Sequence, residues 1–247
     1  MTLQKLSSVS YHLSTVIFPL LLIFTLLTNK QRPDDTALAN MTNMTHKTDT
    51  IHYLALGDSY TIGETVPMSD NFPSQTVQLL RKTGMDIAAP EIVAKTGWTT
   101  DELQTAISNH QFRTSYDFVT LLIGVNNQYR GRSVDDYQPQ FEQLLKQAIA
   151  FAGGKADRVV VLSIPDWGVT PFAEGRDRKQ IAAAIDAYNT ANKAIALKYH
   201  IHYIDITPWT REAATDNSLL AADGLHLSGK EYGRWAVRVV SYFQEVR

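Results

Sequence analysis

A serine, an aspartate and a histidine stand where their side chains could carry out nucleophilic chemistry. Ser59 directly follows the apolar run 53–56, in the sequence Gly-Asp-Ser-Tyr. Asp223 and His226 lie three residues apart near the C-terminus, in Asp-Gly-Leu-His. A serine hydroxyl becomes a nucleophile when a base takes its proton, and a histidine base needs a partner that holds its tautomer. The chain supplies all three groups in the order Ser, Asp, His.

Short apolar runs alternate with helical patterns from about residue 51 onward. This alternation predicts a parallel sheet with helices on both faces. The predicted strands are 52–56, 91–94, 118–123, 158–164 and 202–206. The predicted helices are 72–82, a helix opened by a Thr99–Glu102 capping box, a long helix capped by Ser133, 178–199 and 228–246.

Polar and glycine residues follow the carboxyl ends of these predicted strands. Ser59 follows the first strand, Gly97 the second and Asn126 the third, and both Asp223 and His226 follow the fifth. Ligands of parallel α/β sheets bind at the carboxyl ends of the strands. We therefore expect these five residues to converge on one edge of the sheet.

Bulk composition excludes several classes of function. The chain has 247 residues, 44% hydrophobic and 19% charged, which suits one well-buried domain. The net charge is −2 and there is no basic stripe, so we expect no nucleic-acid partner. The absence of cysteine excludes disulfides, thiolate catalysis and cysteine-ligated zinc.

Four short blocks together resemble those that define the SGNH/GDSL hydrolase family of esterases and lipases, over about residue 51 to the C-terminus. Each block is weak alone, but all four occur in order and at predicted strand ends. The resemblance implies an α/β fold: a three-layer α/β/α, flavodoxin-like sandwich with a five-stranded parallel sheet. The blocks are Gly57-Asp58-Ser59, Gly97 within Lys95-Thr96-Gly97-Trp98, Gly124-Val125-Asn126-Asn127, and Asp223-Gly224-Leu225-His226.

The resemblance also implies a role for each matching residue. Ser59 would be the nucleophile, His226 the base that takes and returns its proton, and Asp223 the group that orients His226. The oxyanion donors would be the backbone N–H groups of Ser59 and Gly97 and the side-chain amide of Asn126. No metal or organic cofactor is implied. The implied substrate is a small acyl ester of a lipid or a sugar, cleaved through an acyl-enzyme.

The chain departs from the family pattern at two positions. Tyr60 replaces the usual leucine of the first block, and we expect it to pack. Asn127 replaces the usual aspartate of the third block, where we expect a loop-supporting role. Asp58 is interpreted as structural, bonding the nucleophile loop.

Other functions remain open at this point. An α/β-hydrolase with a nucleophile elbow needs G-x-S-x-G, but Thr61 stands at the fifth position, and its serine normally follows several strands. An acyltransferase of the same fold would use the same residues. A non-catalytic lipid- or glycan-binding module would lack a triad member, and none is lacking.

The N-terminal residues predict export. The 12-residue apolar run 16–27 suits a signal peptide better than a membrane span of roughly 20 residues. Because Leu6 to Asn29 carries no charge, an uncleaved anchor with membrane association is the alternative. We thus predict a signal peptide or anchor at 1–30, a polar linker at 31–50 and the hydrolase domain at 51–247, outside the cytoplasm. The oligomeric state is not predicted.

Several further features have two interpretations. Trp167 and Trp98 could each line the substrate cleft or pack in a loop. His200 and His202 would face one side of an edge strand, and without a third ligand a metal site is not expected. Residues 172–178 are predicted to form a surface loop.

Overall fold

The structure, a computed structural model, describes residues 50–247. The predicted N-terminal segment 1–30 and nearly all of the predicted linker 31–50 lie outside the described residues. The described residues belong to one compact unit. Described helices include none long and apolar enough to span a membrane.

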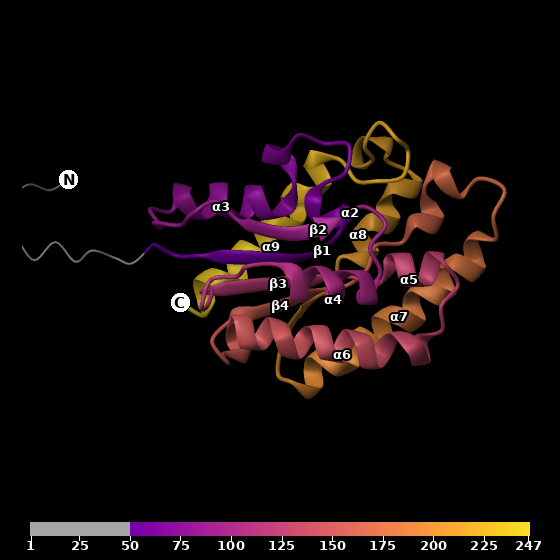
Figure 1. Ribbon diagram of the computed structural model, residues 1–247. Coiled ribbons are helices and arrows are strands. Elements are labelled where there is room, and N and C mark those ends of the chain that lie inside the picture. The colour runs from indigo at the N-terminus through magenta and orange to yellow at the C-terminus, as the bar shows by residue number, and fades with distance from the viewer. Residues whose placement is uncertain (1–49) are drawn as a thin grey trace, which may run out of the picture. The chain divides into compact units, whose positions relative to one another are not determined.

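A five-stranded, all-parallel sheet forms the centre of the described unit (Figure 1). The strand order is β2-β1-β3-β4-β5, so the first strand lies inside the sheet and the chain winds outward in both directions. The strands are β1 (Tyr53–Asp58), β2 (Glu91–Lys95), β3 (Phe118–Leu122), β4 (Val159–Leu162) and β5 (His202–Ile204).

Helices connect the strands. The α-helices are α2 (Ser59–Ile62), α3 (Phe72–Lys82), α4 (Thr100–Asn109), α5 (Val125–Tyr129), α6 (Val134–Phe151), α7 (Arg178–Lys198), α8 (Thr207–Arg211) and α9 (Gly229–Glu245). Short 3₁₀ helices occupy Met68–Asp70, Ala156–Arg158, Trp167–Val169, Pro171–Ala173, Glu212–Ala214 and Asn217–Leu219.

The helices cover both faces of the sheet. On one face α3 packs against α9, and on the other α6 packs against α7 and α4 (Figure 1). The predicted α/β class and three-layer α/β/α sandwich are therefore confirmed. Strands β1, β3 and β4 are fully buried, which explains why their sequences read as continuous apolar runs rather than alternating ones.

Local capping signals place the helix starts where the sequence predicts them. Asn71 caps α3 by accepting the N–H of Ser74, and Ser133 caps α6 by accepting the N–H of Asp136. The predicted capping box before α4 is present. Strands β3, β4 and β5 end one or two residues earlier than predicted, whereas β1 and β2 end two residues and one residue later. After β3 and β4 the apolar residues Ile123 and Ile164 stay buried beyond the last ladder pair, so burial alone does not mark the strand end.

The carboxyl end of β1 brings the chain close to its neighbours. A Cβ atom on Gly57 would lie 2.5 Å from the carbonyl oxygen of Leu122 and 2.1 Å from the hydroxyl of Thr61. Only glycine fits there without moving β3 or α2. The glycine of the first block therefore allows the tight strand-to-helix turn that presents Ser59.

Candidate active site

The Asp223 and His226 side chains form a hydrogen-bonded pair in the turn before α9. His226 Nδ1 lies 2.6 Å from Asp223 Oδ2, and Asp223 Oδ1 accepts the backbone N–H groups of Leu225 and His226, each at 3.0 Å. Partial burial raises the pKa of Asp223, but these hydrogen bonds outweigh it and the net pKa is lowered. The carboxylate is thus ionised and placed to hold the imidazole.

This pairing sets the chemistry of the imidazole. When Nδ1–H donates to the carboxylate, the neutral ring keeps its lone pair on Nε2. His226 is buried, 6% exposed, and lines one cavity together with Ser59. No hydrogen bond joins the Ser59 hydroxyl to His226 within residues 50–247. Such contacts are often long before substrate binds.

Ser59 is the first residue of α2, which begins where β1 ends. Asp58 caps this short helix, since its Oδ1 accepts the N–H of Tyr60 at 3.0 Å. The backbone N–H of Ser59 is the first of the helix and has no acceptor within it. The Tyr60 ring is buried and lies 5.0 Å from the imidazole of His226, between centroids. Tyr60 therefore packs as predicted, and it does so against the candidate base.

Asn126 lies on α5 and lines the same cavity as Ser59. Its Nδ2 donates one hydrogen to the carbonyl oxygen of Trp98 at 3.0 Å. This bond fixes which end of the amide is the nitrogen, and the second Nδ2 hydrogen is left to serve the cavity. Gly97 adopts a left-handed backbone with φ of 81°, which favours glycine.

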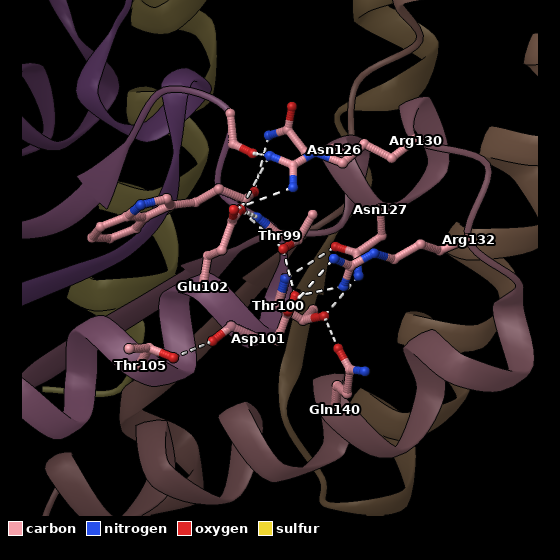
Figure 2. A network of polar contacts seen from close by, with 12 residues as sticks. Thr99, Thr100, Asp101, Glu102, Thr105, Asn126, Asn127, Arg130, Arg132 and Gln140 are labelled. Atoms are coloured by element: carbon pink, nitrogen blue, oxygen red, sulfur yellow. Dashed lines mark hydrogen bonds and ion pairs between the residues drawn. The ribbon is translucent and has the colours of Figure 1, made fainter.

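Asn127, the residue that departs from the family pattern, is buried and supports a neighbouring loop. Its Oδ1 accepts the backbone N–H of Thr100 at 3.0 Å, and its Nδ2 donates to the Thr100 hydroxyl at 2.7 Å (Figure 2). Both ends of its amide are used in this contact. The side chain thus joins α5 to α4, as expected for a loop-supporting residue.

The cavity at Ser59 is small and mostly apolar. Its volume is about 120 Å³. Trp167 forms one wall and is held in place by a 2.7 Å hydrogen bond from its indole N–H to Gln128. Trp98 packs against the core instead and does not line this cavity. The lining residues are Ser59, Tyr60, Val125, Asn126, Tyr129, Trp167, Phe172, Leu225 and His226.

Two lining residues were not predicted from the sequence. Tyr129 and Phe172 are 43% and 42% exposed and lie at the mouth of the cavity, where their ring centroids are 6.0 Å apart. Phe172 lies in the segment interpreted as a surface loop, so that interpretation misses its role. The sequence signal for these two residues is weak. Phe172 is an isolated aromatic in a charged segment, and Tyr129 is an aromatic three residues after Asn126.

The predicted site residues thus fall into two sets. Ser59, His226 and Asn126 share the cavity, and Asp223 reaches it through His226. Gly97 lies in the adjoining loop, beside the Trp98 carbonyl that Asn126 holds.

The prediction that His200 and His202 face one side of an edge strand is wrong for His200. His202 lies in β5, but His200 precedes the strand in a left-handed turn, with φ of 57°, so the two do not share a strand face. Within residues 50–247, no group of three or more His, Asp or Glu side chains could hold a metal ion.

A family model for the GDSL-like lipase/acylhydrolase family matches residues 55–234. The chain therefore belongs to this family and is a carboxylic ester hydrolase. The matched range contains every block quoted above, from Gly57 to His226. A search of the curated proteins finds no match.

Solved structures of similar fold include a lipase/acylhydrolase and an acetylxylan esterase. A lipase/acylhydrolase from Enterococcus faecalis is 19% identical, with a TM-score of 0.60, covering 79% of this chain and 96% of its own. Axe2, an acetylxylan esterase from Geobacillus stearothermophilus, is 18% identical with a TM-score of 0.62, covering 78% and 94%. TesA is 16% identical with a TM-score of 0.61, covering 79% and 99%.

Proposed function

We propose that the chain is a serine esterase in which Ser59 attacks the ester carbonyl. His226 Nε2 takes the hydroxyl proton as the Ser59 oxygen bonds to the carbonyl carbon, and Asp223 stabilises the imidazolium that results. The carbonyl oxygen becomes an oxyanion. It is met by the N–H groups of Ser59 and Gly97 and by the second Nδ2 hydrogen of Asn126.

The rest of the cycle uses the same groups. The tetrahedral intermediate collapses, the carbon–oxygen bond to the alcohol breaks, and His226 returns its proton to the leaving alcohol. A water molecule then attacks the acyl-enzyme while His226 again acts as base. Collapse of the second intermediate releases the carboxylic acid and regenerates the Ser59 hydroxyl.

The observation that carries this proposal is the 2.6 Å bond between His226 and Asp223 on the wall of the cavity that also holds Ser59. The test is steady-state kinetics of Ser59→Ala, His226→Ala and the double variant. Because nucleophile and base act as a unit, each single variant should lose nearly all turnover, and the double variant should be little worse. Near-normal turnover in folded Ser59→Ala would end the proposal.

We propose further that the acyl group is short. A cavity of about 120 Å³ is well below the roughly 300–1,000 Å³ of pockets that enclose drug-sized ligands. Aromatic side chains at its wall and mouth would limit an extended chain. Aryl esters, acylated sugars, thioesters and lysophospholipids all present an acyl carbonyl, so a p-nitrophenyl ester series by chain length should come first. Acetylated xylan follows, supported by the acetylxylan esterase of similar fold.

Hydrolysis and acyl transfer differ only in what accepts the acyl group. Measuring released acid against transferred ester, with rising concentrations of an added alcohol, separates the two. We propose hydrolysis as the main reaction, and dominant transfer at low alcohol concentration would favour an acyltransferase.

We also propose that the enzyme works outside the cytoplasm, delivered by residues 1–30. The support is the 12-residue apolar run 16–27 followed by a polar stretch. Cell fractionation tests this directly, and N-terminal sequencing of the exported protein distinguishes a cleaved signal from a retained anchor. Recovery of all the activity from the cytoplasm would contradict it.

A further inference from the structure

The loop between β2 and α4 carries the Gly97 backbone, and side chains at the α5 end of the site bond to it. Two consecutive carbonyl oxygens of this loop accept bonds from α5 or the residue after it. Arg130 Nη2 donates to the oxygen of Gly97 at 2.7 Å, and Asn126 Nδ2 donates to that of Trp98 at 3.0 Å. Figure 2 shows Asn126, on α5, and Arg130, the residue after α5, reaching toward the loop.

One other side-chain bond holds this loop, from the Thr96 hydroxyl to the Glu64 carboxylate. Beyond the chain neighbours of Gly97, the only atom of residues 50–247 within 4 Å of where a Cβ would stand is Arg130 Nη2, at 3.8 Å. The loop's own turn is closed by a long 3.2 Å bond from the N–H of Trp98 to the oxygen of Lys95. Side-chain packing therefore does not fix this left-handed glycine. Among the described residues, Arg130 supplies the side-chain hydrogen bond that is made to Gly97 itself.

The Arg130 guanidinium is itself held on its other side. Nη1 and Nη2 each lie 3.2 Å from a carboxylate oxygen of Glu102. Glu102 Oε2 also accepts the backbone N–H of Thr99 at 2.8 Å, as part of the α4 capping box. The planar guanidinium thus links three places at once: the loop carbonyl, the first turn of α4, and the end of α5 (Figure 2).

We infer that Arg130 is a positioning residue for the oxyanion site: by holding the Gly97 carbonyl it restrains the backbone rotation of this left-handed glycine, and so the direction in which the Gly97 N–H points. The inference rests on the proposed function, in which that N–H binds the oxyanion. Because the oxyanion forms as the carbonyl is attacked and is absent from the bound ester, loss of this orientation lowers kcat while leaving KM nearly unchanged. An exposed Arg–Glu pair contributes little to stability, so the fold should survive its removal.

The test compares three full-length variants. Arg130→Gln removes the positive charge and the planar guanidinium that bonds Glu102 and the Gly97 carbonyl together. Arg130→Lys keeps the charge but cannot hold both the Gly97 carbonyl and both carboxylate oxygens. Arg132→Gln is the matched control, because Arg132 pairs with Asp101 on the same helix α4, at 2.5 Å, and its side chain bonds no carbonyl of the loop.

We expect Arg130→Gln to lower kcat roughly 10- to 100-fold with little change in KM, less than the 10²–10³-fold typical of deleting a donor outright. The kcat of Arg130→Lys should lie between those of Arg130→Gln and wild type. The kcat of Arg132→Gln should stay within about threefold of wild type. A trifluoromethyl ketone forms an oxyanion adduct, so its Ki should rise in proportion to the fall in kcat/KM. Unchanged kcat in Arg130→Gln, an equal loss in Arg132→Gln, or a loss confined to KM would overturn the inference.

Hydrogen exchange gives a second readout that needs no activity. Amide exchange across 95–99 should quicken in Arg130→Gln and not in Arg132→Gln. Unchanged exchange in Arg130→Gln overturns the inference, whatever the activity. The proposed function fails in a different way, through full ester hydrolysis in Ser59→Ala, so the two failures are distinguishable.

Discussion

The imidazole of His226 and the carboxylate of Asp223 meet at 2.6 Å across a four-residue turn whose backbone the same carboxylate also holds. One oxygen bonds the ring and the other accepts two backbone N–H groups. Ring orientation and turn geometry are therefore fixed by one side chain. A three-residue spacing is enough for this because Gly224, with φ of 65°, turns the chain back between them.

Replacing this carboxylate tests the tautomer argument. Asp223→Asn can present an N–H to Nδ1, which would move the ring proton to Nε2 and remove the base facing Ser59. We expect kcat to fall by about 10³- to 10⁴-fold, comparable to the effect of the equivalent change in a Ser-His-Asp triad. Asp223→Glu serves as the comparison that keeps the charge. Activity of Asp223→Asn within about tenfold of wild type, measured on the same ester, would contradict the triad assignment.

The Asn126 and Asn127 side chains should respond in opposite ways. Asn126→Ala should lower kcat by about 10²- to 10³-fold with little change in KM, because the lost donor acts on the transition state. Asn126→Asp should be at least as harmful, since it places a negative charge beside the oxyanion. Asn127→Asp keeps an acceptor for the Thr100 N–H and should be tolerated.

Steady-state kinetics on these three variants decides the assignment. A large kcat loss in Asn127→Asp combined with a mild effect in Asn126→Ala would reverse the two roles. Thermal unfolding of each variant controls for loss of the α5–α4 contact.

Much of this arrangement follows from the sequence, and the exceptions have physical causes. The strands, the α3 boundaries and the capping box before α4 are local signals, and the structure confirms them. The sharing of one cavity by Ser59, Asn126 and His226 follows from parallel-sheet topology. The contacts of Arg130 and Phe172 depend on how loops pack in three dimensions, which periodicity does not encode.

Buried Asp58 should make stability depend on pH. Burial raises its pKa to about 7 from 3.8, against the hydrogen bond from the Tyr60 N–H, which lowers it. A carboxyl whose folded pKa is raised contributes stability that is complete below pH 3.8 and is lost as pH rises through about 7. The loss is at most about 4 kcal/mol, at 1.36 kcal/mol per pKa unit.

Asp58→Asn removes this titration while keeping an oxygen to cap α2. The free energy of unfolding, measured by urea denaturation from pH 4 to 8, should therefore fall less steeply in Asp58→Asn than in wild type. Asp135→Asn, at an exposed carboxylate of α6, is the control and should keep the wild-type slope. Parallel curves for wild type and Asp58→Asn would rule this account out.

Phe172 at the cavity mouth should limit acyl length. Phe172→Ala removes the ring that packs against Tyr129 and so opens the apolar wall of the cavity. We expect kcat/KM for octanoyl relative to acetyl p-nitrophenyl esters to rise roughly tenfold, since burying about two more methylenes at about 0.8 kcal/mol each favours the longer chain. Met68→Ala, at an exposed apolar side chain that does not line the cavity, is the control. An unchanged chain-length profile in Phe172→Ala would place the acyl group elsewhere.

The described unit should function without the N-terminal segment. The described residues, 50–247, lie in one compact unit and hold every proposed catalytic group. A protein starting at Thr48 should therefore be soluble, with kcat and KM close to those of the full chain. An insoluble or inert product, alongside an active full-length protein in detergent, would show that the first 47 residues belong to the enzyme domain.

The central claim is that Ser59 is a nucleophile activated by His226, and covalent labelling tests it most directly. The full-length protein is treated with a fluorophosphonate, digested and sequenced by mass spectrometry, alongside His226→Ala. We predict one adduct, on Ser59, formed in step with loss of esterase activity and at least about a hundredfold more slowly in His226→Ala, the scale of general-base catalysis. Ester hydrolysis that survives complete labelling of Ser59, or an inactivating adduct on another residue, would contradict the account.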